Sequence, residues 1–105
     1  MNDSFYQKCL ISSEYYPLFV ETVLLDVQKL YRQGRKYDFI SLSKTTHRLK
    51  GMFALLNLFL GQELCEVLEQ HIANINTSEI KKSIHHINLF VSTLVQQGEK
   101  GYDKN

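Results

Sequence analysis

The chain has 105 residues, of which 44% are hydrophobic, so it is long enough for one compact domain with a single apolar core. Its 12 Lys and Arg residues nearly balance its 11 Asp and Glu residues, which leaves a formal net charge of +1 at pH 7. The basic residues are spread along the sequence, and we therefore expect neither nucleic-acid binding nor direct contact with an anionic membrane.

The two cysteines, Cys9 and Cys65, lie far apart in the sequence and form no CxxC pair. They indicate neither a disulfide framework nor a zinc site, and they fit a reducing compartment. The first four residues lack the basic start and apolar core of a signal peptide. The longest apolar stretch, residues 52–60, is interrupted by Asn57 and is much shorter than the about 20 residues that cross a bilayer. We expect a soluble, cytoplasmic chain.

The first predicted helix begins near Ser13 and ends at Gly34, and Pro17 suits its first turn. Apolar residues recur in it at steps of three and four, which places one stripe on a common face: Phe19, Val23, Val27, Leu30 and Tyr31.

The second predicted helix is capped by Asp38 and ends near Asn57, a residue type that tolerates the left-handed conformation of a helix end. Residues 57–61 then form a turn. The apolar face of this helix consists of Phe39, Leu42, Thr46, Leu49, Phe53 and Leu56.

A third helix is indicated by the stripe Leu64, Cys65, Leu68 and Ile72, which fades in the polar residues 74–78. Asn76 followed by Glu79 has the spacing of a capping box at the start of a fourth helix, which we expect to end at Gly98. Its stripe consists of Ile80, Ile84, Ile87, Val91 and Leu94.

These elements predict an all-α protein, an antiparallel up-and-down four-helix bundle with a short N-terminal arm. No strand pattern with hairpin chemistry occurs, and the connections are short enough for antiparallel neighbours. The predicted organisation is an arm at residues 1–12, a bundle at 13–98 and a C-terminal tail at 99–105.

One histidine of the second helix is predicted to face solvent. His47 lies roughly 120° around the helix from the centre of the apolar stripe. On its own face lie small or cationic residues: Ser43, Lys50, Gly51 and Ala54. A neutral imidazole nitrogen is a good nucleophile, and a nearby ammonium favours a phosphoryl group. The alternative is an ordinary solvated helix face.

The motif His47-Arg48-Leu49-Lys50-Gly51, followed in the next helix by Leu64-Cys65 and Leu68-Glu69, resembles the signature of histidine phosphotransfer domains. This resemblance implies that His47 is the phosphoacceptor, that Lys50 stabilises the phosphate and that Gly51 provides steric access. The usual family glycine ten residues after the histidine is Asn57 here, and we expect the turn to survive. Related domains place a glutamine that orients the imidazole at the position of Glu69.

The longer run of residues 47–58 is similar to the phosphotransfer domains of the enterobacterial Rcs envelope-stress phosphorelay. This similarity implies reversible exchange of phosphate with the receiver domains of an RcsC-like hybrid sensor kinase and an RcsB-like response regulator. It also implies that the chain is the cytoplasmic C-terminal domain of an inner-membrane protein.

No Walker or kinase-type glycine loop occurs in the sequence, so we expect a phosphotransfer intermediate without kinase or ATPase activity of its own. The chain is then expected to hold no cofactor, and the divalent metal (Mg²⁺) would be supplied by the partner receiver domain.

The surface around His47 is the predicted docking face for receiver domains, and the isolated domain is expected to be a monomer. Its candidate residues are Ile40, Ser43, Lys44, Arg48, Ala54, Leu55, Val20 and Leu24. For Val20 and Leu24, a contribution to the core stripe is an equal alternative.

The remaining histidines and Cys65 favour structural roles. Adjacent His85 and His86 point about 100° apart, which suits no shared metal, and His71 lies near the end of a helix. Cys65 falls in an apolar stripe, as a small core residue does. The main alternative function is a non-catalytic helical interaction or scaffold module; a DNA-binding domain is disfavoured by the charge.

Overall fold

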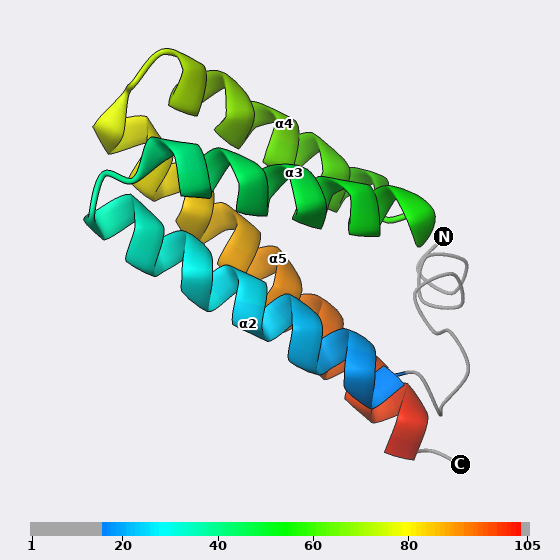
Figure 1. Cartoon of the computed structure of the whole chain (residues 1–105). Coiled ribbons are helices and arrows are strands. Elements are labelled where there is room, and N and C mark those ends of the chain that lie inside the picture. The colour runs from blue at the N-terminus through cyan, green and yellow to red at the C-terminus, as the bar shows by residue number, and fades with distance from the viewer. Residues whose placement is uncertain (1–15, 104–105) are drawn as a thin grey trace.

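The computed structural model describes residues 16–103, with side chains described for residues 17–97, and it has four α-helices in this range. The helices are α2 (Tyr16–Arg35), α3 (Phe39–Leu55), α4 (Phe59–Ala73) and α5 (Thr77–Asp103). Successive helices run antiparallel, with the α2–α3 and α4–α5 connections at one end and the α3–α4 connection at the other (Figure 1). The predicted all-α four-helix bundle is confirmed, whereas the predicted arm and the predicted start at Ser13 lie outside the described residues.

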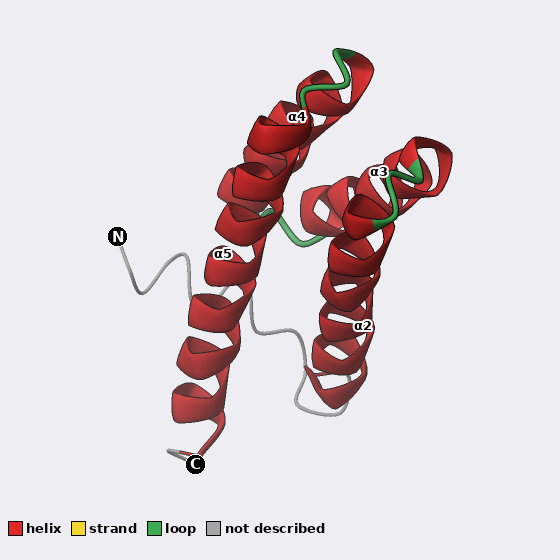
Figure 2. Cartoon of the chain, turned by 90° about the vertical axis from the view of Figure 1, so that its left-hand side faces the viewer, coloured by secondary structure: helices red, strands yellow, loops and turns green. Residues whose placement is uncertain are grey.

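The four helices are arranged as a square. The pairs α2–α3, α3–α4, α4–α5 and α2–α5 pack against each other, and within the described range the two diagonal pairs do not. Figure 2 shows the two hairpins side by side, α4 with α5 and α2 with α3. The furrow between α3 and α4 is therefore on the opposite side of the bundle from the furrow between α2 and α5.

The core is formed by the apolar stripes that the sequence predicts. Buried members include Val23, Leu42, Leu68 and Ile87, and each fully buried aliphatic side chain contributes about 1.5–3 kcal/mol. The rings of Phe53 and Phe90 meet edge to face, with centroids 5.5 Å apart and planes at 86°. The further buried apolar residues are Phe19, Val27, Leu30, Leu49, Phe53, Leu58, Cys65, Ile72, Ile80, Ile84, Val91 and Leu94.

All three connections use the same helix-ending motif. Tyr37, Asn57 and Ile75 have positive φ angles of 55°, 60° and 52°. The residue after each donates its backbone N–H five residues back: Asp38 to Gln33 (3.0 Å), Leu58 to Phe53 (2.8 Å) and Asn76 to His71 (3.0 Å). This is the Schellman pattern, which favours Gly or Asn at the positive-φ position. The expectation that Asn57 preserves the turn is confirmed.

Two predicted helix starts are confirmed by their caps. The Asp38 carboxylate accepts a hydrogen bond from the backbone N–H of Ser41 at 3.2 Å. Hydrogen bonding from the side chain and the backbone of Ser41 lowers the pKa of Asp38. The side chain of Asn76 accepts a hydrogen bond from the backbone N–H of Glu79 at 3.4 Å.

The predicted helix stop at Gly98 was wrong, and the predicted stop at Gly34 is one residue short. α2 continues past Gly34 to Arg35, and α5 continues past Gly98 to Asp103. A glycine lowers helix stability by about 1 kcal/mol but ends a helix only where the backbone turns left-handed. No glycine in the described part of the chain has a positive φ.

None of the described helices combines the length and apolar character needed to span a bilayer.

Candidate functional site

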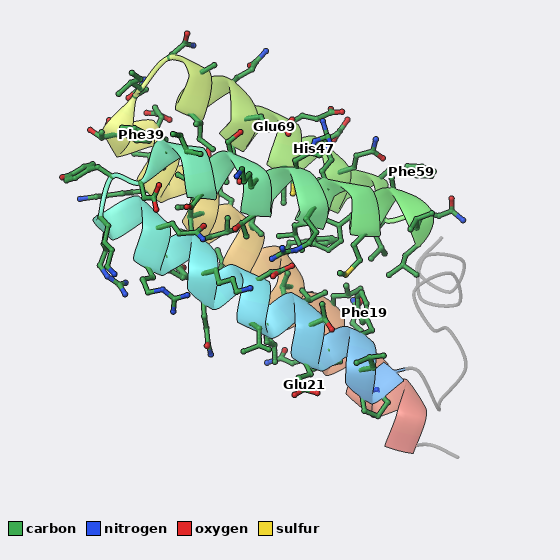
Figure 3. The ribbon with its side chains drawn as sticks, in the orientation of Figure 1. Phe19, Glu21, Phe39, His47, Phe59 and Glu69 are labelled. Carbon is green, nitrogen blue, oxygen red and sulfur yellow. The ribbon has the colours of Figure 1, made fainter. Side chains whose placement is uncertain are left out.

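His47 projects from the middle of α3 into solvent, as the helical spacing predicts, and its side chain is 77% exposed (Figure 3). The residues that hold this part of α3 lie on its other side. Thr46 and Leu49 are fully buried, and the Thr46 hydroxyl donates a hydrogen bond to the Leu42 carbonyl at 2.7 Å. The backbone beneath the imidazole is thus fixed by core packing.

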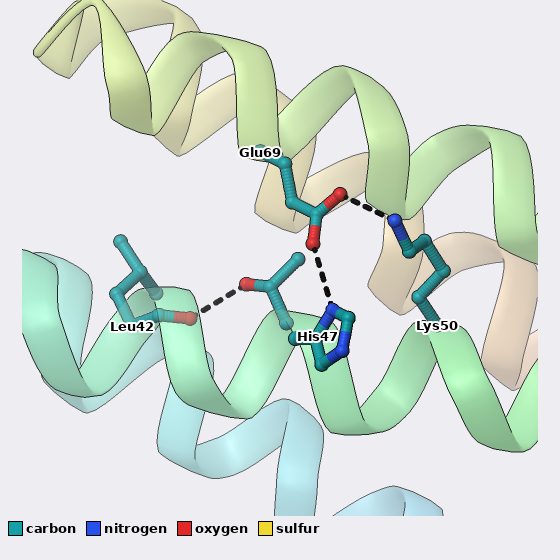
Figure 4. A network of polar contacts seen from close by, with 5 residues as sticks. Leu42, His47, Lys50 and Glu69 are labelled. Atoms are coloured by element: carbon teal, nitrogen blue, oxygen red, sulfur yellow. Dashed lines mark hydrogen bonds and ion pairs between the residues drawn. The ribbon is translucent and has the colours of Figure 1, made fainter.

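Glu69 of α4 contacts both His47 and Lys50 of α3. Its Oε2 lies 3.5 Å from the imidazole Nδ1, and its Oε1 accepts a hydrogen bond from the Lys50 ammonium at 2.8 Å (Figure 4). The side chains of Lys50 and Glu69 are only about one quarter exposed, at 24% and 27%. The structure therefore brings together three of the four residues that the family resemblance singles out, His47, Lys50 and Glu69.

This geometry distinguishes the two imidazole nitrogens. The 3.5 Å separation is longer than an ordinary N–H···O hydrogen bond, but it directs Nδ1 at the carboxylate. When Nδ1 carries the proton, the lone pair resides on Nε2, away from Glu69. The hydrogen bond to Glu69 also raises the pKa of Lys50, which keeps the ammonium charged.

Gly51 leaves open space next to this group. It lies on the exposed side of α3, and a Cβ added there would meet no atom within 4 Å. The fold therefore does not require glycine at this position, in contrast to Gly61, where a Cβ would lie 2.7 Å from both the Phe53 and Phe90 rings.

Arg48 forms an ion pair with a residue that the sequence reasoning missed. Its guanidinium donates to the Asp26 carboxylate of α2 at 2.6 and 3.4 Å, and this contact raises the pKa of Arg48. The Asp26 side chain is 4% exposed, and a buried carboxylate needs such a partner. The signal was available, because Asp26 falls within the apolar stripe between Val23 and Leu30.

The predicted docking residues differ in exposure. Ile40 and Leu55 are 73% and 86% exposed, and Ser43, Lys44 and Arg48 are also exposed. Ala54 is half-buried. Val20 is partly buried against the core, which agrees with its alternative structural role, whereas Leu24 is exposed. The surface around His47 thus presents large apolar side chains, and their contact with a receiver remains a prediction.

Cys65 and the other histidines form no second reactive centre. Cys65 is fully buried, and burial raises the pKa of its thiol to about 12, so the core interpretation is confirmed. Across the described part of the chain, no three or more His, Cys, Asp or Glu side chains are placed to hold a metal ion. The Tyr31 hydroxyl lies 3.5 Å from His85 Nδ1.

Comparisons with known proteins agree with this geometry. The sequence pattern of the Hpt domain family matches residues 14–97. The chain is 46% identical over 86 residues to the phosphotransferase RcsD of Escherichia coli (strain K12), covering 82% of this chain but only 10% of RcsD. It also resembles the solution structure of the Escherichia coli YojN histidine-phosphotransferase (HPt) domain, with 48% identity and a TM-score of 0.74, covering 78% of this chain and 71% of that one.

The family match covers most of the chain, and it includes the exposed imidazole together with the lysine and carboxylate beside it. The curated relative is far longer, so the similarity concerns one domain of it. On these grounds, the chain belongs to the family of histidine phosphotransfer (Hpt) domains.

Proposed function

We propose that the domain relays a phosphoryl group between two receiver-domain aspartates and carries it in between on Nε2 of His47. The observation that carries this proposal is the exposed imidazole whose Nδ1 faces Glu69, which turns Nε2 away from that carboxylate, with the Lys50 ammonium on the same carboxylate.

In the loading step, the Nε2 lone pair of His47 attacks the phosphorus of an aspartyl phosphate on the donor receiver. The new N–P bond forms as the P–O bond to the aspartate breaks, and the carboxylate leaves with the bonding electron pair. The imidazole then carries a positive charge shared with its Nδ1–H, which the Glu69 carboxylate favours. The unloading step is the reverse, toward the aspartate of a second receiver.

Lys50 and Glu69 have different roles in this scheme. Lys50 supplies positive charge to the equatorial phosphoryl oxygens, and its length allows it to move from Glu69 to them. Glu69 is a positioning residue, because it acts on the phosphoryl group only through the imidazole. Gly51 leaves room for the approaching receiver. The acidic pocket of the receiver supplies the divalent metal, which neutralises phosphoryl charge.

The similarity to RcsD supports a choice of partners. We propose an RcsC-like hybrid sensor kinase as one receiver-bearing partner and an RcsB-like response regulator as the other. A cytoplasmic location at the C-terminal end of an inner-membrane protein fits these partners. Both docking events would use the surface around His47, including Ile40 and Leu55.

The test is transfer from a radiolabelled, phosphorylated receiver domain to the purified chain. The parent protein should acquire a label that resists base and is lost in acid, and His47→Gln should acquire none while its circular dichroism spectrum is unchanged. His86→Gln, which changes another exposed histidine, is the matched control and should label normally. Undiminished labelling of His47→Gln would refute the proposal, and absence of label on the parent with cognate receivers would favour a non-catalytic interaction module.

A further inference from the structure

The furrow between α2 and α5 contains a pocket of about 260 Å³ that the phosphotransfer mechanism does not use. It is lined by Tyr31, Gly34 and Arg35 of α2 and by Lys81 and Ile84 of α5. The bundle is square, so this furrow is on the opposite side from the α3–α4 furrow that holds His47 and Glu69.

The floor of the pocket is apolar, and α2 and α5 approach each other closely there. Gly34 is buried, and a Cβ at that position would lie 3.0 Å from Cδ1 of Ile84. Ile84 is almost fully buried, and the ring of Tyr31 packs against the core beside it. Beside this close contact, an apolar hollow remains open to solvent between the two helices.

The rim of the pocket is cationic and unneutralised. Arg35 and Lys81 lie on opposite edges, and Arg32 is one turn before Arg35 on α2. Within the described residues, none of these three cations takes part in an ion pair, whereas neighbouring Lys82 pairs with Glu79 at 3.5 Å. The residues that line the pocket include no Asp or Glu.

Part of the acidic charge is on the far side of the bundle from this pocket. The acidic side chains Glu63, Glu66 and Glu69 are on α4, across the bundle from α2. In the sequence, Arg35 is far from Lys81, and the antiparallel packing of α2 against α5 brings the two to one pocket.

We infer that this furrow is a second docking site, which binds an acidic segment of a partner protein through one apolar side chain seated between Arg35 and Lys81. The charge of the rim favours an anionic occupant. The pocket is smaller than the about 300–1,000 Å³ typical of small-molecule sites, and its size suits a single anchoring side chain.

A membrane surface fits the same charges less well. Lipid-binding basic segments gather about 4–8 Lys and Arg on one face, whereas two unpaired cations, Arg35 and Lys81, line this hollow. Since the site is across the bundle from His47, a partner can remain bound while a receiver exchanges phosphate. The inference does not depend on the phosphotransfer proposal, because it concerns binding alone.

The experiment is an NMR titration of the ¹⁵N-labelled 105-residue chain with synthetic peptides. The probe is a Glu-rich peptide with one central Phe, and the matched peptide has Ala in place of Phe. The Phe peptide should shift the amide signals of Gly34 and Ile84 and leave that of His47 unchanged. In Arg35→Glu/Lys81→Glu, its affinity should fall about tenfold or more.

The control variant is Lys44→Glu, which reverses an exposed cation on α3 and should retain the parent affinity. Equal binding of the Phe and Ala peptides, or equal loss in Lys44→Glu, would overturn the inference, because either result would indicate attraction to charge in general. Phosphatidylglycerol vesicles are the final arm. Vesicle binding that is lost in the double variant, without peptide binding, would assign the furrow to a lipid surface and also overturn it.

Discussion

At the residue scale, two side chains beside His47 have different proposed roles: Lys50 supplies charge, and Glu69 orients the imidazole. Lys50 contacts Glu69 at 2.8 Å, and the same carboxylate faces the imidazole at 3.5 Å. Neutral substitutions at these two positions therefore act on different parts of the proposed reaction.

Lys50→Ala should slow phosphotransfer to His47 by roughly 10²-fold, because it removes the cation that faces the developing phosphoryl charge. Glu69→Gln should have a much smaller effect, since its amide oxygen still accepts a hydrogen bond from the imidazole, and Glu69→Ala should fall between the two. Rapid-quench transfer assays at saturating receiver would measure these rates. Equal losses in Lys50→Ala and Glu69→Gln would contradict the division of roles.

The two glycines that follow His47 in the sequence, Gly51 on α3 and Gly61 on α4, should respond in opposite ways to alanine. Gly51→Ala should raise the free energy of unfolding by about 1 kcal/mol, because its Cβ meets open space and alanine favours a helix interior. Gly61→Ala should lower it by about 1–3 kcal/mol, because its Cβ overlaps two phenyl rings. Urea denaturation distinguishes the cases. A destabilised Gly51→Ala would show that this glycine is structural.

The direction in which His47 points could be predicted from sequence, but its contacts could not. Helical spacing alone determines which face of α3 is apolar, and it placed the imidazole in solvent correctly. The contact with Glu69 depends on how far α4 slides along α3, which no periodicity encodes. The Asp26–Arg48 pair depends in the same way on the packing of α2 against α3.

At the element scale, the connections carry strain that differs from one to the next. The same Schellman turn places Asn57, Tyr37 and Ile75 in the left-handed region, and Ile75 is both β-branched and exposed. Only the first of these is a residue type that the conformation favours.

Ile75→Asn should raise the free energy of unfolding by about 1 kcal/mol, because asparagine adopts the left-handed conformation more readily than a β-branched residue. Ile75→Val is the matched control, since it keeps the branched Cβ and should leave stability nearly unchanged. Thermal unfolding of the two variants would decide the matter. Stabilisation by both, or by neither, would exclude backbone strain as the cause.

Helix boundaries were predictable where a side chain makes the cap and not where glycine was taken as the stop. Asp38 signals the start of α3 because its carboxylate accepts a backbone hydrogen bond there. Gly34 and Gly98 were misleading, since packing keeps the first within α2 and the second lies inside α5. Tyr37, the residue that turns left-handed after α2, carries no such signal in its type.

At the scale of the whole molecule, the buried thiol of Cys65 reports on global unfolding. In a Cys9→Ser background, Cys65 should react with a thiol reagent only as fast as the bundle opens, because the residue is fully buried and its pKa is raised to about 12. Labelling followed by mass spectrometry, with and without urea, measures this. Fast labelling in native buffer would contradict the packing described for α4.

The same thiol determines the direction in which the free energy of unfolding changes with pH in the alkaline range. Its folded pKa of about 12 exceeds the ordinary value of 9.0, so its contribution to stability is fully present below pH 9. The contribution is lost as pH rises from about 9 toward 12, because the unfolded chain then releases the proton first. Cys65→Ala should lack this component of the alkaline decline in unfolding free energy.

His47 lies between two ion pairs that reach opposite neighbours, Arg48 with Asp26 on α2 and Lys50 with Glu69 on α4. This stretch of α3 is therefore restrained from both flanks before any partner arrives. Under the proposed relay, the loss of orientational entropy at the nucleophile is incurred once, when the chain folds, and is not repeated at each encounter. The rate of phosphoryl exchange would then depend on how often receivers meet the domain in a productive orientation. Solvent viscosity would therefore affect this rate more than motions within the bundle would.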